Sequence, residues 1–212
     1  MTKNNTLLLL LTLSGLLLSC GQSDTRPPLL KKLVNYDKYP AMTEAGYYNA
    51  VIEIPAGTNR KIEYNKAGKK FETDQRNGKD RIINFLGYPG NYGYIPGTLA
   101  AKANGGDGDA LDVLVLAESV PTGTVTEVKL IAALRLADEG EEDTKFIAIP
   151  ADTTLQTMQI ADFEDFMINY DAVRRMTEDW FLNYDGPNTN RLLGWKDEVY
   201  ARRQIEKQRI QK

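Results

Sequence analysis

Short runs of apolar and β-branched residues occupy much of the sequence between residues 47 and 149. Runs of this kind predict β-strands, and the glycine, proline, asparagine and aspartate residues between them predict turns. The predicted strands cover residues 47–54, 61–64, 81–85, 112–116, 125–136 and 145–149. Because no helical pattern separates these runs, they favour an antiparallel barrel or sandwich over parallel strand–helix–strand units.

The hydrophobic period changes after residue 170. Five apolar residues recur there at helical spacing: Val173, Met176, Trp180, Phe181 and Tyr184. This spacing predicts a helix with Asp171 at its N-cap, and Gly186-Pro187 is a typical stop signal. A second, charged helix is predicted from about Lys196 to Ile210. The fold class is therefore mainly β, with helices confined to the C-terminal part.

The N-terminal segment has a different pattern, with Lys3 followed by an apolar run over residues 7–18. A helix of that length spans about 18 Å and is too short for the ~30 Å hydrocarbon core of a membrane. We therefore expect a signal peptide over residues 1–19. The run ends in Leu17-Leu18-Ser19-Cys20-Gly21, which resembles a bacterial lipobox and implies lipidation of Cys20. A plain signal peptide with an incidental cysteine is the alternative.

The signal peptide implies that the chain is exported. If Cys20 is lipidated, the protein is anchored to the periplasmic side of a bacterial membrane or to the outer membrane. Residues 20–40 are polar and contain proline, so we interpret them as a lipidated N-terminus and tether. Residues 41–212 then form the functional domain.

Composition excludes several classes of protein. The chain has 212 residues, no histidine, one cysteine and a formal net charge of -3. Without histidine there is no serine–histidine or cysteine–histidine nucleophile and no histidine-ligated metal. Near-balanced charge argues against nucleic acid as a partner. Any catalysis must use carboxylates, lysine, arginine, tyrosine or a bound metal.

The segment from Gly105 to Val115 is the most informative, because Asp107, Asp109 and Asp112 follow one another within six residues at the start of an apolar run. Converging carboxylates repel one another unless a cation lies between them. Oxygen ligands without histidine or thiolate favour Mg²⁺, Mn²⁺ or Ca²⁺. A solvated acidic turn is the alternative interpretation. An EF-hand loop fails, because Leu111 and Asp112 occupy positions that need a ligand and a glycine.

Three further groups carry related chemistry. A second acidic loop covers residues 138–145, and upstream Glu53 is followed by the alternating Lys61-Ile62-Glu63. Residues 87–94 place tyrosine hydroxyls on a glycine-spaced backbone. Each group alone could be an ordinary hairpin or core packing. Together they supply carboxylates for divalent cations, and lysine, arginine and tyrosine donors for phosphate oxygens.

These groups resemble, in order, the motifs of soluble-type (family I) inorganic pyrophosphatases. The D-x-D-x-x-D hallmark stands here at residues 107–112, and the other motifs stand at residues 52–55, 61–63, 88–94, 138–145 and 183–184. The resemblance implies a small, twisted, five-stranded OB-like barrel flanked by helices. It also implies metal-dependent hydrolysis of pyrophosphate by direct attack of an activated water.

The resemblance also implies roles for individual residues. The implied metal ligands are Asp107, Asp112, Asp138 and Asp143, with Glu53 and Glu63 as supporting carboxylates. The implied general base is Asp109. The implied phosphate-binding residues are Lys61, Arg81, Tyr92, Lys145 and Tyr184. The cofactor would be Mg²⁺, with Mn²⁺ as an alternative, and Ca²⁺ is expected to inhibit.

Two positions depart from the family pattern. The phosphate-binding arginine is either Arg81 or Arg76, and Arg81 is preferred because it opens an apolar run. Asp185 stands where the family usually has lysine after the tyrosine, so we expect a negative charge at the phosphate pocket and weaker substrate binding. The alternative is that Asp185 points to solvent and that Lys196, Arg191 or another cation fills the pocket. A catalytically weakened phosphate- or calcium-binding lipoprotein is the alternative function, and a purely structural lipoprotein is a third. A homo-oligomer is compatible with the sequence.

Overall fold

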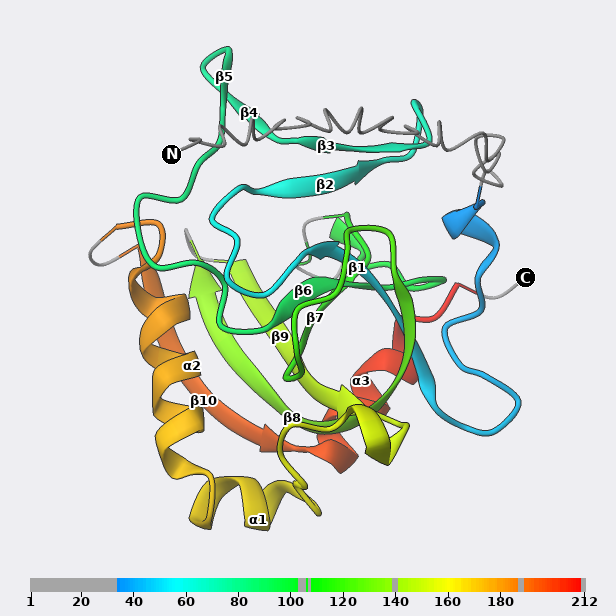
Figure 1. The fold of residues 1–212 in the computed structure, drawn as a ribbon, viewed down its shortest axis with the longest axis vertical. Helices are drawn as coiled ribbons and strands as arrows, with labels where there is room; N and C mark the ends of the chain where they lie inside the picture. The colour runs from blue at the N-terminus through cyan, green and yellow to red at the C-terminus, as the bar shows by residue number, and fades with distance from the viewer. Residues whose placement is uncertain (1–33, 103–105, 107, 139–140, 187–188, 211–212) are drawn as a thin grey trace, which may run out of the picture. The chain divides into compact units, whose positions relative to one another are not determined.

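Five strands close into a ring in the computed structural model, which describes residues 34–102, 106, 108–138, 141–186 and 189–210 (Figure 1). The strands around the ring are β1 (Tyr48–Ile54), β6 (Asn91–Ile95), β7 (Leu111–Val115), β9 (Glu141–Pro150) and β8 (Val125–Asp138). β8 closes the ring by pairing with β1, and β10 (Asn190–Asp197) adds to the sheet on β8. The predicted five-stranded, mainly β fold is confirmed.

The apolar pattern of the sequence favours a wholly antiparallel arrangement, but one pair of strands in the ring is parallel. β7 and β9 run parallel, with Val113 opposite Phe146 and Val115 opposite Ala148. The other four pairs around the ring are antiparallel. The reason is parity, since directions cannot alternate all the way around a ring with an odd number of strands.

Most predicted strands are present. The runs at residues 47–54, 112–116, 125–136 and 145–149 fall in β1, β7, β8 and β9, and residues 61–64 largely match β2 (Ile62–Asn65). β2 pairs with β3 (Lys70–Thr73) in a separate hairpin, and β4 (Gln75–Arg76) pairs with β5 (Lys79–Asp80) in another. The prediction of a strand at residues 81–85 is wrong, because that segment forms only an isolated β-bridge between Ile82 and Arg60. Its apolar Ile83 is buried in the core instead.

The sequence did not predict β6 as a strand, because glycine weakens a strand pattern. Gly93 is nevertheless required there. A Cβ atom at this position would lie 1.9 Å from the backbone oxygen of Val51 on the neighbouring strand β1. The close approach of the two backbones explains why glycine occupies the middle of a ring strand.

Two helices match the predicted C-terminal pattern with changed ends, and a third, α1, was not predicted. The helices are α1 (Phe163–Ile168), α2 (Asp171–Asn183) and α3 (Glu198–Lys207), with short 3₁₀ turns η1 (Tyr36–Lys38) and η3 (Thr153–Leu155). Asp171 is the first residue of α2 rather than its N-cap, which is Tyr170. α3 starts later than predicted because Asp197 caps it, accepting a hydrogen bond from the Tyr200 backbone N–H, while Lys196 belongs to β10. No helix among the described residues is both long and apolar enough to span a membrane.

Two large clusters of buried residues use opposite faces of the ring strands. On β9, for example, Phe146 belongs to one cluster and Ile147 to the other, as the period of a strand requires. One cluster draws on all five ring strands and is closed by Ala201 and Ile205 of α3. The other packs the ring against α1 and α2, chiefly through Phe166 and Phe181.

The compact unit begins at Val34, before the expected boundary at residue 41. Tyr36 explains the difference, because its ring packs 5.0 Å from that of Phe71 and its hydroxyl donates a hydrogen bond to the Gly123 carbonyl. The predicted signal peptide over residues 1–19, Cys20 and most of the tether lie outside the described residues.

Candidate active site

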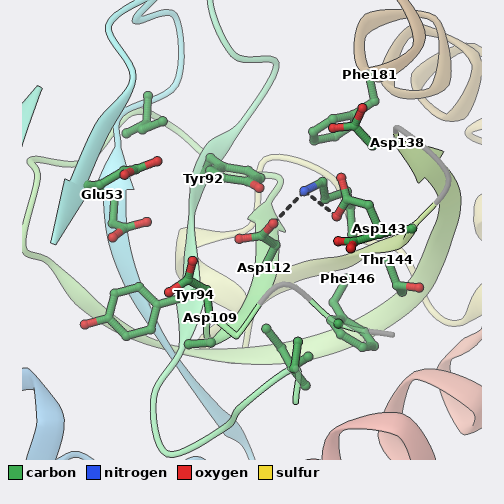
Figure 2. A pocket seen from close by; sticks show the side chains of 18 of the residues that line it. Glu53, Tyr92, Tyr94, Asp109, Asp112, Asp138, Asp143, Thr144, Phe146 and Phe181 are labelled. Carbon is green, nitrogen blue, oxygen red and sulfur yellow. Dashed lines mark hydrogen bonds and ion pairs between the residues drawn. The ribbon is translucent and has the colours of Figure 1, made fainter. Parts of the chain in front are cut away.

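A cavity of about 840 Å³ gathers the side chains that the sequence indicated from distant parts of the chain (Figure 2). All but one of the predicted catalytic, phosphate-binding and metal-binding residues line it. These are Glu53, Lys61, Glu63, Arg81, Tyr92, Asp109, Asp112, Asp138, Asp143, Lys145 and Tyr184. The exception is Asp107, which lies outside the described residues. The separate motifs therefore form one site.

The parallel pair of strands builds the centre of the cavity. Val113 of β7 pairs with Phe146 of β9, so the preceding residues, Asp112 and Lys145, also lie beside each other. Asp143 lies two residues before Lys145 and therefore on the same face of β9. Both carboxylates reach one ammonium group, with Lys145 Nζ 2.5 Å from Asp112 Oδ2 and 2.6 Å from Asp143 Oδ1 (Figure 2).

Lys145 is a buried cation. Its side chain is 6% exposed, and its Nζ atom lies 5.6 Å from the centre of the Tyr92 ring. Burial alone would lower the pKa of the Lys145 ammonium, but the charges of Asp112 and Asp143 raise this pKa well above its ordinary value. Lys145 therefore stays charged and offsets part of the negative charge around it.

The carboxylates near Lys145 outnumber it. Burial raises the pKa of Asp143, and the negative charges of Asp112 and Asp138 act in the same direction against the opposing charge of Lys145. Burial likewise raises the pKa of Glu53 to about 8, with a further contribution from Asp112, although Glu53 accepts a 2.7 Å hydrogen bond from a backbone N–H. The cavity thus contains carboxylates that further positive charge would stabilise.

Divalent cations fit this donor set. The donors are carboxylate oxygens, which suit Mg²⁺ and Mn²⁺. Within the described part of the chain, no three acidic side chains are arranged around one point as a ready metal cluster. Lys145 Nζ occupies the space between Asp112 and Asp143, which shows that a positive group is accommodated there.

The upstream group enters the cavity as the alternating sequence predicted. Lys61 Nζ lies 2.6 Å from Glu63 Oε1, which confirms that the two side chains share one face. Asp109 lies at the rim, where its side chain is 78% exposed and its carboxylate is 3.9 Å from Lys66 Nζ. Lys66 also lines the cavity and was not singled out from the sequence, because one lysine in a polar turn carries no pattern.

Tyrosines line the cavity, among them the buried Tyr92 and the half-buried Tyr184. Burial raises the pKa of Tyr92 well above its ordinary value and also raises the pKa of Tyr184, so both hydroxyls remain protonated donors. The Tyr184 ring stacks on Trp180 of α2 with ring centres 4.7 Å apart. Tyr88 and Tyr94 line the same cavity. The sequence left aromatic core packing open as the alternative for residues 87–94. The tyrosines of this segment do both, since they are buried and also line the cavity.

Both candidate arginines line the cavity, and both pair with Asp185. Arg81 Nη2 lies 3.0 Å from Asp185 Oδ2, and Arg76 contacts both carboxylate oxygens at 3.2 Å. Burial would raise the pKa of Asp185, but the hydrogen bond from Arg76 and the charge of Arg81 hold it below its ordinary value. The Asp185 carboxylate at the cavity is therefore paired with two arginines. The expectation that its negative charge simply repels a phosphate group has to be revised.

A closed β ring whose cavity combines crowded carboxylates with lysine, arginine and tyrosine donors defines a site for a compact polyanion together with cations. The sequence profile of the inorganic pyrophosphatase family matches residues 50–211. An inorganic pyrophosphatase from Ureaplasma parvum is 33% identical over 162 residues, covering 74% of this chain and 81% of that protein. One from Saccharolobus solfataricus is 35% identical over 164 residues, covering 75% and 88%.

Solved structures agree with the sequence comparison. The crystal structure of an inorganic pyrophosphatase from Neisseria gonorrhoeae matches with a TM-score of 0.68 and 28% identity, covering 82% of this chain and 96% of that chain. The enzyme from Thermus thermophilus matches with a TM-score of 0.67 and 27% identity, covering 82% and 95%. The chain belongs to the inorganic pyrophosphatase family.

Proposed function

We infer that this protein is an inorganic diphosphatase, which hydrolyses pyrophosphate to two phosphates. The observation that carries this inference is the cavity itself, where the carboxylates and the phosphate-binding cations implied by the family motifs converge. A weakened phosphate- or calcium-binding lipoprotein is not favoured. Every described member of the predicted catalytic set lines the cavity, and a protein that only binds phosphate needs no general base.

Divalent metal ions, Mg²⁺ first, complete the site in this proposal. Asp107, Asp112, Asp138 and Asp143 would hold them, with Glu53 and Glu63 in support. Bound metal would lower the pKa of a water molecule and offset the charge of the substrate. The raised pKa values of Asp143 and Glu53, which burial causes first and neighbouring carboxylates increase, support this role because a bound cation would favour their charged forms.

The other residues bind the substrate and accept a proton. Lys61, Arg81 and Lys145 would neutralise phosphate oxygens, and the protonated hydroxyls of Tyr92 and Tyr184 would donate hydrogen bonds to them. Asp109 would accept the proton of the attacking water. Its exposed position at the cavity rim gives it access to water entering from solvent.

Phosphate release by the full chain in detergent, measured with Mg²⁺ and pyrophosphate, tests the function. We expect turnover with Mg²⁺ and none in excess EDTA, because the site is completed by metal. Asp109→Asn should lower kcat by about 10² or more while the fold is kept, the usual scale for losing a general base. Asp80→Asn is the matched control, since Asp80 is exposed and does not line the cavity. Turnover that persists in EDTA would contradict the metal requirement.

We also propose that the protein is exported and anchored by lipid on Cys20. The support is the apolar run before the chain's only cysteine and the lipobox-like residues around it. The several acyl chains of a bacterial lipoprotein hold a protein stably on a membrane, which one chain does not. Cys20→Ser should move the protein from the membrane fraction to the soluble fraction. Wild-type protein found wholly in the soluble fraction would refute the anchor.

A further inference from the structure

The hairpin β4–β5 sends one side chain to the cavity, that of Arg76, which the sequence left as the alternative to Arg81 for the phosphate-binding arginine. Arg76 lies on β4 and is 56% exposed, yet it lines the cavity. Its Nη1 and Nη2 atoms each donate a hydrogen bond to a different oxygen of Asp185, 109 residues further along the chain. This two-point geometry fixes the plane of the guanidinium as well as its position.

Arg81 completes a group of three charged side chains at the cavity. Its Nη2 shares the Asp185 Oδ2 atom with Arg76, so one carboxylate contacts two guanidinium groups. Arg81 has a second acidic neighbour, Asp74, at 3.5 Å. The three cavity-lining members, Arg76, Arg81 and Asp185, carry a net charge of +1, since two positive charges meet one negative charge.

Both guanidinium groups keep unused hydrogen-bond donors. An arginine has five N–H donors, and Arg76 uses one on each of two nitrogens to bind Asp185. The Nε atom of Arg81 is buried and has no hydrogen-bond partner among the described residues. The Nη1 and Nη2 atoms of Arg81 each carry two N–H donors and donate to Asp74 and Asp185 respectively, so Arg81 retains capacity for a ligand oxygen.

We propose that Arg76 is a substrate-binding residue and that Asp185 is the positioning residue that holds Arg76 and Arg81 toward a phosphate group. This inference rests on the proposed function. In this arrangement, Arg76 supplies the positive charge that the sequence lacks at position 185, and it comes from a different segment. Asp185 therefore favours substrate binding through its two arginines instead of opposing it.

A surface ion pair without a function is the competing explanation. Exposed pairs contribute little to stability because water and salt screen them. The chain offers such a pair for comparison nearby. Arg60, which lies just before β2, has its Nη1 atom 3.4 Å from Oδ2 of Asp80 on β5, and neither residue lines the cavity. Arg60 is 57% exposed, which closely matches Arg76. Arg60→Ala is therefore a matched control.

Steady-state kinetics of the full chain in detergent at saturating Mg²⁺ test the proposal. Arg76→Ala should raise KM for pyrophosphate by about tenfold or more, the usual effect of losing a hydrogen bond to a charged group, with kcat within about twofold. Asp185→Asn should also raise KM, because the amide no longer holds both arginines. Arg76→Lys and Asp185→Glu should recover part of the loss, and Arg60→Ala should leave KM unchanged.

The sign of the Asp185→Asn effect separates the two explanations. If Asp185 merely repelled the substrate, its neutralisation would lower KM. A KM that is unchanged or lower in either Arg76→Ala or Asp185→Asn overturns the proposal. If the wild-type protein itself does not hydrolyse pyrophosphate, that result counts against the proposed function instead. In that case, calorimetric binding of imidodiphosphate, a pyrophosphate analogue, by the same variants still tests the role of Arg76.

Discussion

Replacing Lys145 with methionine tests the electrostatics of the cavity, because Lys145 is the buried cation between Asp112 and Asp143. The two carboxylates lie 2.5 and 2.6 Å from its Nζ atom and are 27% and 25% exposed. Methionine has a similar length and fills similar space without a charge. The substitution therefore removes the ammonium and leaves two carboxylates facing each other.

The expected loss of stability follows from this geometry. Removing one partner of a buried ion pair costs about 3–5 kcal/mol, and the partial exposure of both carboxylates favours the lower end, about 3 kcal/mol. For a domain of this size, each kcal/mol shifts the melting temperature by about 2–4 °C. Lys145→Met should therefore lower Tm by about 6–12 °C in EDTA.

Magnesium should reverse much of this loss, because a divalent cation can neutralise the two carboxylates in place of the ammonium. At a concentration about 100 times its Kd, a ligand that binds only the folded state adds about 2.7 kcal/mol. Thermal unfolding of wild-type and variant proteins in EDTA and in Mg²⁺ measures both effects. The Tm gain on adding Mg²⁺ should be larger in Lys145→Met than in the wild type.

Lys70→Met is the matched control. Lys70 Nζ also lies 2.6 Å from a carboxylate, that of Glu72, but the two side chains are 63% and 40% exposed. Its loss should cost less than about 1 kcal/mol in either condition. The reasoning would be refuted if Lys145→Met lowered Tm equally in EDTA and in Mg²⁺, or no more than Lys70→Met.

Three further predictions concern the site and the fold. Asp112→Ala should raise the Mg²⁺ concentration needed for half-maximal activity by about tenfold or more, because it removes a proposed ligand; an unchanged requirement would remove Asp112 from the metal site. Gly93→Ala should abolish soluble expression or lower Tm sharply, because its Cβ would meet a backbone oxygen at 1.9 Å; a wild-type Tm would contradict the close approach of β1 and β6. Asp197→Ala should cost about 1 kcal/mol in urea unfolding by removing the α3 cap, and a loss below about 0.3 kcal/mol would argue against it.

The sequence predicts much of this fold because most ring strands carry their own apolar pattern. β8 and β9 are nearly continuous runs, and α2 shows a clear helical period. The pattern fails where tertiary contacts decide the structure. β6 is a strand because the backbone of Val51 approaches Gly93, a contact that no local pattern records. Closing a ring of five strands likewise requires at least one parallel pair, and only the folded ring shows that this pair is β7 and β9.

The candidate site is more predictable than the fold around it, because its residue types cluster in short motifs. Even so, the motifs do not show which groups meet. Lys145 was expected only as a phosphate-binding residue, yet in the structure it also pairs with Asp112 and Asp143. That contact depends on the register of β7 against β9, in which Val113 pairs with Phe146, and neither motif alone records which strand the other one pairs with.

Asp185 shows why a change of charge at one position can mislead when it is interpreted alone. An aspartate in place of lysine changes the local charge by two units, which suggests a damaged phosphate pocket. The structure places two arginines on this aspartate, one of them from a hairpin more than a hundred residues away in sequence. With both arginines counted, the three cavity-lining side chains carry a net charge of +1, and Asp74, which also pairs with Arg81, does not line the cavity. The relevant unit for a polyanion is thus the whole set of charges that it meets, and that set exists only after folding.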